Sequence, residues 1–251
     1  MMKALITGAS SGIGFEMAKY LGNLGYGVIA VGRNEERLEA LKAAVPSTRT
    51  ISMDLSAEEH CISLYESLRG EEIGIVINNA GFGLYGEFAD TSLDTEVKMI
   101  GTNITALHIL TKLFYRDMLK RDSGYIMNVA SVAGFMPGPL MSTYYATKAY
   151  VARLTQAVRE EATARKSKVR LSLLCPGPVK TRFDEVAGIQ MGLTSLSAEY
   201  VAKYAVDRML KGKFMIVPGA GIKAAMVFAK LFPDSLTAKG AMLMQGRKRK
   251  A

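Results

Sequence analysis

Residues 7–14 read TGASSGIG, a glycine-rich turn that follows a short apolar run and precedes a segment with helical periodicity. A turn of this kind between a strand and a helix is typical of dinucleotide-binding sites, although glycine clusters also occur in ordinary turns. Gly8 permits the sharp turn, Gly12 lets the backbone approach a pyrophosphate, and Gly14 lets the helix pack close to the sheet. Phosphate would bind at the helix N-terminus, where free N–H groups favour anions. The candidate cofactor residues of this turn are Gly8, Ser10, Ser11, Gly12, Ile13 and Gly14.

Short apolar runs alternate with longer helical segments along most of the chain. The predicted strands cover 3–7, 28–31, 51–53, 73–77, 125–129, 169–174 and 214–217, and the predicted helices cover 13–24, 35–44, 56–68, about 94–120, 143–166 and 198–211. Ser56 and Glu59 have the spacing of a capping box at the start of the third helix. One helix between successive strands indicates a parallel sheet, and uniformly apolar strands indicate a sheet covered on both faces. We therefore expect an α/β fold, a Rossmann-type doubly wound parallel sheet of about seven strands with helices on both faces.

The 251 residues, of which 49% are hydrophobic, are expected to form a single domain over 1–251. The chain has two cysteines, no signal-peptide pattern and no apolar run of membrane-spanning length, which favours a cytoplasmic protein. The net charge of +9 is concentrated in 223–251, which hold seven Lys/Arg and one Asp. The body shows no motif that reads nucleic acid, so no such partner is expected. His60 and His108 do not cluster with cysteines or acids, so no metal site is expected.

The end of the second predicted strand indicates which dinucleotide the turn would bind. NAD sites usually place an acid here to hold the ribose 2′-hydroxyl, but Gly32 occupies that position and Arg33 follows it. A guanidinium binds a 2′-phosphate bidentately, and no carboxylate repels the phosphate. The sequence therefore favours NADP(H), the alternative being that Arg33 is an ordinary solvated side chain.

Tyr144 and Lys148, in STYYATK, are four residues apart and share one face of a predicted helix. An ammonium close to a phenol favours the phenolate and lowers the tyrosine pKa, which makes the phenol a usable acid or base near neutral pH. The neighbouring Tyr145 has Ala149 four residues on, so Tyr144 is the better candidate. This pair occurs by chance in many proteins, and its significance depends on the motifs around it.

In their order and spacing, the motifs resemble those of the short-chain dehydrogenase/reductase family from residue 7 to about residue 181. TGASSGIG is similar to the family's TGxxxGxG, and Ser131 lies 13 residues before Tyr144, the usual family spacing. The other matching residues are Asp54, Leu55, Asn78, Asn79, Ala80, Gly81, Asn103, Pro176, Gly177, Pro178, Val179 and Thr181. The resemblance implies that Asp54 and Leu55 contact adenine and that 176–181 contact the nicotinamide end of the cofactor.

The resemblance also implies a mechanism. Tyr144 would exchange a proton with the substrate oxygen, and Lys148 would lower the Tyr144 pKa and hold the nicotinamide ribose. Ser131 would hydrogen-bond the substrate oxygen, and Asn103 would hold a water that connects Lys148 to solvent. Hydride would pass between NADP(H) and the substrate carbon. Asn79, Ala80, Gly81, Pro176, Gly177, Val179 and Thr181 would contact the cofactor. The family likeness implies a homodimer or homotetramer, and an NADP-binding sensor without turnover is the alternative to an enzyme.

Residues 182–196 fall where this family places its substrate lid. The apolar residues expected to form a pocket for an apolar ketone or aldehyde are Phe82, Met136, Leu140, Phe183, Val186, Ile189, Met191 and Leu193. The C-terminal extension, 219–251, is amphipathic and ends in a basic tail. It fits an anionic membrane surface, a cover over the substrate pocket or a subunit interface. The first of these gives a further alternative, a membrane-surface reductase of lipid or acyl substrates.

Overall fold

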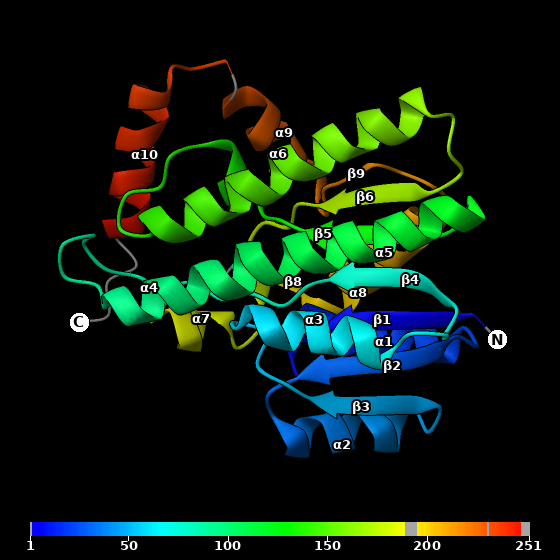
Figure 1. Ribbon diagram of the computed structural model, residues 1–251. Coiled ribbons are helices and arrows are strands. Elements are labelled where there is room, and N and C mark those ends of the chain that lie inside the picture. Colours follow the sequence, from blue (N-terminus) through cyan, green and yellow to red (C-terminus); the bar gives the residue numbers. More distant parts are fainter. Residues whose placement is uncertain (1, 189–194, 230, 247–251) are drawn as a thin grey trace.

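The computed structural model describes residues 2–188, 195–229 and 231–246, and its centre is a seven-stranded parallel sheet (Figure 1). The strands are β1 (Lys3–Thr7), β2 (Gly27–Gly32), β3 (Thr48–Ser52), β4 (Ile73–Asn78), β5 (Tyr125–Val129), β6 (Arg170–Leu174) and β9 (Met215–Ile216). Their order is β3-β2-β1-β4-β5-β6-β9, and every pair is parallel. The order reverses between β1 and β4, which leaves a crevice at the carboxyl ends of these strands. The predicted doubly wound sheet is confirmed.

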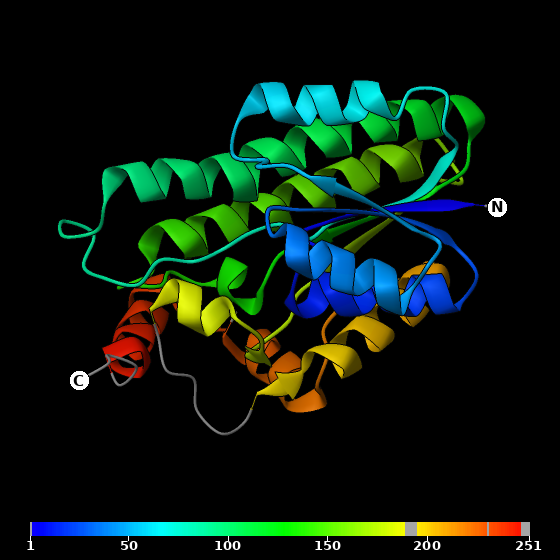
Figure 2. The same ribbon diagram turned by 90° about the horizontal axis from the view of Figure 1, so that it is seen from below.

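Helices cover both faces of the sheet, as Figure 2 shows from a second direction. One layer consists of α1 (Gly12–Asn23), α2 (Glu35–Ala44) and α8 (Ala198–Leu210). The other consists of α3 (Glu58–Ser67), α4 (Leu93–Ile100), the π-helix η1 (Gly101–Ala106), α5 (Leu107–Arg121) and α6 (Ser142–Ala164). Smaller elements follow the strands at the carboxyl edge: η2 (Val132–Phe135), β7 (Val179–Lys180), α7 (Phe183–Ala187), β8 (Leu196–Ser197), α9 (Ala220–Ala229) and α10 (Asp234–Gly246).

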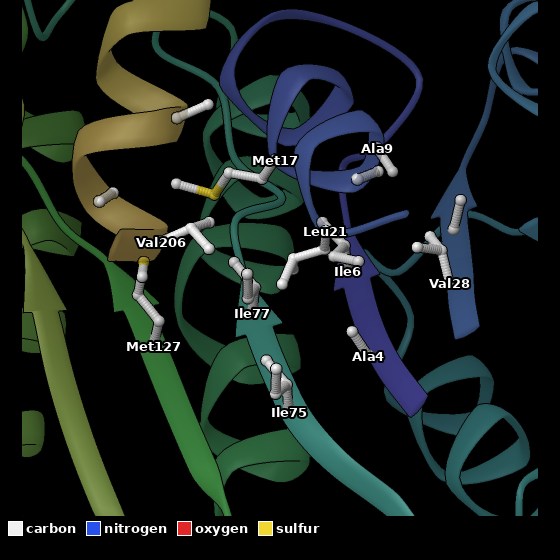
Figure 3. Close-up of a cluster of buried hydrophobic side chains, with 14 of the residues drawn as sticks. Ala4, Ile6, Ala9, Met17, Leu21, Val28, Ile75, Ile77, Met127 and Val206 are labelled. Atoms are coloured by element: carbon white, nitrogen blue, oxygen red, sulfur yellow. The ribbon is translucent and has the colours of Figure 1, made fainter. Parts of the chain in front are cut away.

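The apolar strands supply a core on each side of the sheet. Ala4 and Ile6 of β1 face the layer of α1 and α8, whereas Leu5 between them faces the opposite layer. Figure 3 shows the first cluster, in which Met17 of α1 and Val206 of α8 close over the strands. Burying each such large side chain stabilises the fold by about 1.5–3 kcal/mol. Two layers of this kind hold the strand ends, and the loops that follow them, in fixed positions.

A polar cluster inside the second layer ties two strands to two helices. Asn78 at the end of β4 donates to Asn128 of β5 at 2.9 Å and to Thr111 of α5 at 3.0 Å. Thr111 and Thr155 of α6 also bond to Asn128. All four side chains are buried, so the hydrogen bonds offset the cost of removing them from water.

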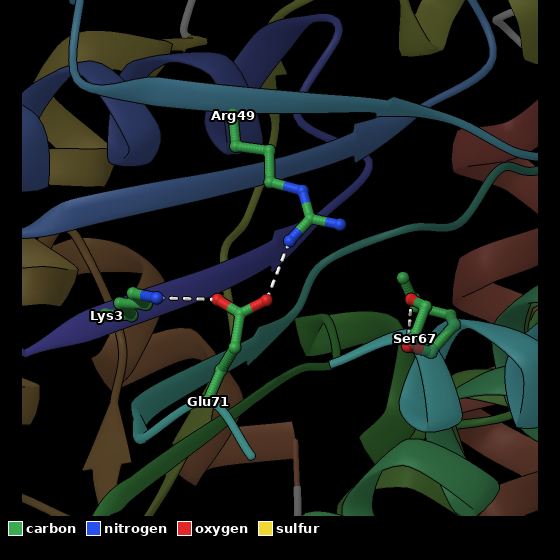
Figure 4. Close-up of polar contacts among 5 residues, drawn as sticks. Lys3, Arg49, Ser67 and Glu71 are labelled. Atoms are coloured by element: carbon green, nitrogen blue, oxygen red, sulfur yellow. Dashed lines mark hydrogen bonds and ion pairs between the residues drawn. The ribbon is translucent and has the colours of Figure 1, made fainter. Parts of the chain in front are cut away.

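At the opposite, amino end of the sheet, Glu71 bridges Lys3 and Arg49 at 2.7 Å each (Figure 4).

Several local details differ from the sequence prediction. The capping box at Ser56 is wrong, because α3 begins at Glu58 after Ala57 and lacks a side-chain cap. Ser56 lies before the helix, and its backbone N–H donates to the Asp54 carboxylate at 3.0 Å. The helix predicted at about 94–120 is interrupted by η1, and the last strand is shorter than 214–217. Residues 189–194 of the predicted lid and 247–251 of the basic tail lie outside the described residues.

Candidate active site

A cavity of about 420 Å³ opens at the carboxyl ends of the strands and collects nearly all the predicted site residues. Those that line it are Gly8, Ser10, Ser11, Gly12, Ile13, Arg33, Asp54, Leu55, Asn79, Ala80, Gly81, Ser131, Tyr144, Lys148, Pro176, Gly177, Val179 and Thr181. Gly14 and Asn103 are not part of the lining. Both lie directly behind it: Gly14 contacts Gly8 and Asn79 of the lining, and Asn103 contacts Gly81 and Phe82.

The β1–α1 turn forms one wall of the cavity and requires its glycines. Gly8 and Gly12 have φ values of +66° and +57°, which L side chains rarely adopt. A Cβ on Gly14 would collide with the Gly8 carbonyl oxygen and the Asn79 amide, so only glycine lets α1 approach this closely. Ser11 is the N-cap of α1 but makes no side-chain cap bond, and the first turn, all of which is described, holds no acid. Its N–H groups therefore face the cavity as an anion-binding end.

The loop after β4 is locked to the loop after β1. The Thr7 hydroxyl accepts hydrogen bonds from the backbone N–H groups of Asn79 and Ala80, both at 3.0 Å. The Asn79 side chain donates back to the carbonyl oxygens of Thr7 and Gly8, at 3.0 and 3.2 Å. These bonds pair the polar groups at the end of β1 with those at the end of β4, and they fix the shape of the cavity floor.

The far end of the cavity carries the exposed side chain of Arg33. A Cβ on Gly32 would come within 2.9 Å of the Ser10 side chain, so an acidic side chain does not fit at this position. Arg33 lines the cavity beside Asp54. Burial acts to raise the Asp54 pKa, but hydrogen bonds from Ser56 and the charge of Arg33 outweigh it and lower the pKa. This end therefore offers a guanidinium, and Gly32 leaves no carboxylate at the end of β2.

Ser131 and Tyr144 meet near the middle of the cavity. Ser131 follows β5, accepts from the Ala133 N–H at 3.1 Å and donates to the Pro176 carbonyl oxygen at 3.4 Å, and its hydroxyl acts to lower the pKa of the Tyr144 phenol. The segment after β6 closes this region, because the Pro176 carbonyl oxygen accepts from Val132 at 3.1 Å. Thr181 on the same segment lies against Gly12, where a Cβ would be 3.0 Å from its methyl group. Ser131 and Tyr144 thus line the same cavity as the glycine-rich turn.

The pKa values of Tyr144 and Lys148 differ from the sequence prediction. Burial raises the pKa of Tyr144 to about 12, and it lowers the pKa of Lys148 to about 8. The Lys148 Nζ lies 5.9 Å from the Tyr144 ring centroid and donates to the Val129 carbonyl oxygen at 2.9 Å. The predicted lowering of the Tyr144 pKa by Lys148 is therefore wrong, because the desolvation of the phenol raises its pKa and is the largest effect on it. Tyr144 is a neutral phenol at pH 7, suited to donating a proton.

Asn103 acts from behind the cavity. It lies in η1, where the wider π-helical turn interrupts the long helix and directs this side chain at the loop after β4. Its amide oxygen accepts from the Phe82 N–H at 3.0 Å, and its nitrogen donates to the Phe82 oxygen and to Thr147 at 2.9 and 3.0 Å. These bonds position Phe82 and Gly81 in the cavity wall. The water-holding role that the resemblance implies stays a prediction.

The substrate end of the cavity combines predicted and unpredicted residues. Phe82, Met136, Phe183 and Val186 line it as predicted, but Leu140 does not. Ile189, Met191 and Leu193 lie outside the described residues. Pro178, within the predicted segment 176–181, also lines the cavity. Lining residues missed from the sequence are Val31, Gly32, Met53, Thr102, Val129, Ala130, Val132, Ala133, Met141, Tyr145 and Gln245. Most of these adjoin predicted residues, whereas Gln245 comes from α10 and had no sequence signal beyond the suggestion that the extension covers the pocket.

Within 2–188, 195–229 and 231–246, no group of three or more His, Cys, Asp or Glu side chains is placed to hold a metal ion. None of the helices in these ranges combines the length and the apolar character needed to cross a membrane.

Comparisons with known proteins agree with this geometry. An uncharacterised oxidoreductase of Staphylococcus epidermidis is 35% identical over 187 residues, which cover 72% of this chain and 80% of that protein. The human very-long-chain 3-oxoacyl-CoA reductase is 35% identical over 63% of this chain and 54% of its own length. A short-chain dehydrogenase from Sphingobium yanoikuyae, solved in complex with NADPH, superposes with a TM-score of 0.83 at 29% identity and covers 92% of this chain and 94% of that one.

A second solved structure, a short-chain dehydrogenase/reductase from Burkholderia phymatum in complex with NAD, gives a TM-score of 0.80 at 25% identity over 90% and 91% of the two chains. The family model described as short chain dehydrogenase matches residues 2–192, which include the glycine-rich turn and the Ser131, Tyr144 and Lys148 positions. With a family model over most of its length and a doubly wound sheet that carries these motifs at its carboxyl edge, the chain belongs to the short-chain dehydrogenase family of oxidoreductases.

Proposed function

We propose that the protein is an NADP(H)-dependent oxidoreductase that interconverts a carbonyl and an alcohol, acting as a reductase of an apolar ketone or aldehyde. The observation that carries this proposal is the grouping of Ser131, Tyr144 and Lys148 in the same cavity as the free N-terminus of α1. A protein that only senses a dinucleotide has no need of a half-buried proton donor in the binding cavity.

The cavity fits a nicotinamide dinucleotide. Gly8 and Gly12 let the backbone form a cradle that a Cβ would fill, and the start of α1 supplies N–H groups for a pyrophosphate. Asp54, Leu55 and Thr181 line the same cavity, where Asp54 and Leu55 would contact the adenine and Thr181 the nicotinamide end. Related chains were solved with NADPH and with NAD, so their cofactors are consistent with this assignment. Bound NADPH supplies the hydride, and the protein supplies position and charge.

Arg33 supports the phosphorylated cofactor. It lines the cavity at the end of β2, and the close contact between Gly32 and Ser10 leaves no room for an acid there. A guanidinium hydrogen-bonds a phosphate in a charge-assisted, bidentate manner, which a ribose hydroxyl does not reproduce. We therefore infer that the protein prefers NADP(H) to NAD(H).

The protein's own groups provide the acid chemistry. Ser131 donates a hydrogen bond to the substrate carbonyl oxygen, and Tyr144 transfers its proton to that oxygen as negative charge develops on it. Tyr144, with a pKa of about 12, is fully protonated at neutral pH, so the acid is in its competent form. The Lys148 ammonium, 5.9 Å from the ring centroid, stabilises the phenolate that remains.

The direct experiment follows NADPH and NADH oxidation by absorbance against a panel of apolar ketones, aldehydes and acyl thioesters, with the purified full chain. Turnover that depends on NADPH supports the proposal, and the ranking within the panel identifies the substrate class. Tight NADPH binding without turnover on any carbonyl would contradict it and favour the sensor alternative.

A second candidate function, a membrane-surface reductase of lipid or acyl substrates, has one observation in its favour. Exposed apolar side chains are concentrated on α9, α10 and their connection: Phe228, Leu231, Phe232, Leu236, Met242 and Leu243. Lys223 and Lys239 lie on the same helices, a composition that suits an anionic bilayer surface. Co-sedimentation with anionic liposomes, compared between the wild type and a Leu231→Ser/Leu243→Ser double variant, tests it. Equal sedimentation of the two proteins would count against membrane contact.

We also propose that the protein is a homodimer or homotetramer. Exposed apolar residues on α4 and α6, namely Val97, Ile100 and Tyr150, give these long helices a surface suited to self-association. Light scattering coupled to size-exclusion chromatography measures the mass directly, and a mass equal to the 27.2 kDa chain would contradict the proposal.

A further inference from the structure

The last turn of α10 places a polar side chain in the wall of the catalytic cavity. Gln245 is only 2% exposed and lines the cavity. Its backbone oxygen accepts from the Tyr85 hydroxyl at 3.0 Å, across 160 residues of chain, and its Nε2 donates to the Tyr145 hydroxyl at 2.7 Å. Figure 1 shows α10 standing beside the N-terminal end of α6, from which Tyr145 comes. Two tyrosines therefore fix this turn against the cavity.

Gln245 and Tyr145 form a pair that does not use all of its hydrogen-bonding groups. Gln245 Oε1 is shielded from solvent and has no hydrogen-bond partner among the described residues. The Tyr145 hydroxyl accepts from Gln245, and no described residue accepts its proton. The pair consequently offers a free acceptor, the Gln245 Oε1, next to free donors, the Tyr145 hydroxyl and the second Nε2–H of Gln245. Turning the amide over exchanges the two roles and leaves the same combination.

Tyr145 is held in place for such a role and is separate from the acid chemistry. Its ring lies against Gly138, where any Cβ would collide with the ring carbons. It directly follows Tyr144, with the two ring centroids 6.1 Å apart at 76°. Burial raises the Tyr145 pKa, so the hydroxyl keeps its proton at neutral pH.

The surroundings of the pair are apolar. Tyr144 and Tyr145 pack with Met141, Phe183 and Ala187 in one cluster. In such surroundings an unpaired polar group is costly, because neither water nor another side chain replaces the missing hydrogen bond. A ligand that completes the pair is favoured over an otherwise equal ligand that leaves it unpaired.

We propose that Gln245 and Tyr145 form a specificity site that recognises a hydroxyl group of the substrate, separate from the carbonyl that reacts at Tyr144. A hydroxyl both donates and accepts, which matches the free acceptor and donor of the pair. An ether oxygen only accepts, and an alkyl group does neither. The proposal rests on the proposed function in that it names the substrate class: an apolar carbonyl compound that carries a hydroxyl group away from the carbonyl.

The test uses ω-hydroxyalkan-2-ones of increasing chain length, each compared with its methyl ether and with the unsubstituted ketone. For at least one chain length, the wild type is expected to show a kcat/KM for the hydroxy ketone at least about tenfold above that for the ether, the equivalent of one net hydrogen bond. In Gln245→Leu and in Tyr145→Phe this ratio falls towards one, mainly through a higher KM for the hydroxy ketone. Gln156→Leu, on the outer part of α6, is the matched control and keeps the ratio.

Circular dichroism and the melting temperature show whether each variant is folded. Should Gln245→Leu detach α10, Tyr145→Phe decides alone, because it deletes a single oxygen atom and leaves the Tyr85 contact in place. Equal kcat/KM for hydroxy ketone and ether at every chain length in the wild type would overturn the proposal. A preference that persists in the folded variants would overturn it as well.

Failure of the proposed function gives a different result, namely no NADPH-dependent reduction of any ketone by the wild type. Calorimetric titration with terminal alkanediols and their mono-methyl ethers then tests the site without turnover. Tighter binding of the diols that is lost in Tyr145→Phe supports the hydroxyl site, and equal binding of diols and ethers overturns it.

Discussion

The two ends of the cavity are built in different ways. At the cofactor end, backbone constraints dominate: Gly8 and Gly12 need positive φ, Gly14 needs the absence of a Cβ, and Thr7 engages the N–H groups of Asn79 and Ala80. At the substrate end, side chains from α7 and α10 pack onto α6, and the contacts join residues far apart in the chain. The first end suits a ligand of constant shape, and the second suits a ligand that differs among relatives.

The largest effect is expected at the junction of the two ends. Tyr144→Phe removes the proton donor and should lower kcat by about 10²–10⁴-fold, because a positioned general acid contributes about that much. NADPH affinity, measured by fluorescence titration, should change little. Tyr150→Phe, further along the same helix with its hydroxyl on His108, is the control. Retention of most of the activity by Tyr144→Phe would place the acid elsewhere.

A second variant tests the cofactor end of the cavity independently of the substrate end. Arg33→Ala should weaken NADPH binding by roughly 10–100-fold, the worth of a charge-assisted contact, and leave NADH binding nearly unchanged. The substrate KM at saturating cofactor should stay the same. Arg37→Ala, on α2 but outside the cavity lining, serves as the control. Equal weakening of both cofactors would show that Arg33 does not contact the 2′-phosphate.

The pH dependence sharpens the assignment of charges at the junction. The Lys148 pKa is lowered by burial to about 8, so its ammonium is present below that pH and lost above it, while Tyr144 stays protonated up to about pH 12. Because the ammonium stabilises the phenolate left behind, kcat for carbonyl reduction should fall as the pH rises through about 8. A profile that stays flat from pH 6 to about 10 would contradict this role for Lys148.

The smallest effect concerns the scaffold behind both ends. Thr111→Val keeps the shape of the side chain but removes the hydroxyl that bonds Asn78 and Asn128. It should lower the free energy of unfolding by about 1–3 kcal/mol, as measured by chemical denaturation, without changing the cofactor preference. Thr163→Val, exposed near the end of α6, should cost less. Loss of NADPH binding in folded Thr111→Val would mean that this cluster belongs to the site.

The same contrast explains how far the sequence could predict the structure. Glycines with positive φ and apolar strands impose local constraints, so the sheet and the cofactor end could be predicted from 7–14, 78–81 and 131–148. The opposing pKa shifts of Tyr144 and Lys148 depend on burial by several elements, which a four-residue spacing does not reveal. The interruption at Asn103 and the arrival of Gln245 in the cavity likewise depend on tertiary packing rather than on local pattern.

The central claim is that this cavity carries out hydride transfer to a carbonyl with Tyr144 as the acid. The most direct measurement uses NADPH deuterated at both positions of nicotinamide C4 and mass spectrometry of the alcohol formed from the best ketone of the panel. The account predicts an alcohol one mass unit heavier with the wild type and almost none with Tyr144→Phe. Tight NADPH binding without a deuterated alcohol from any ketone or aldehyde would contradict it.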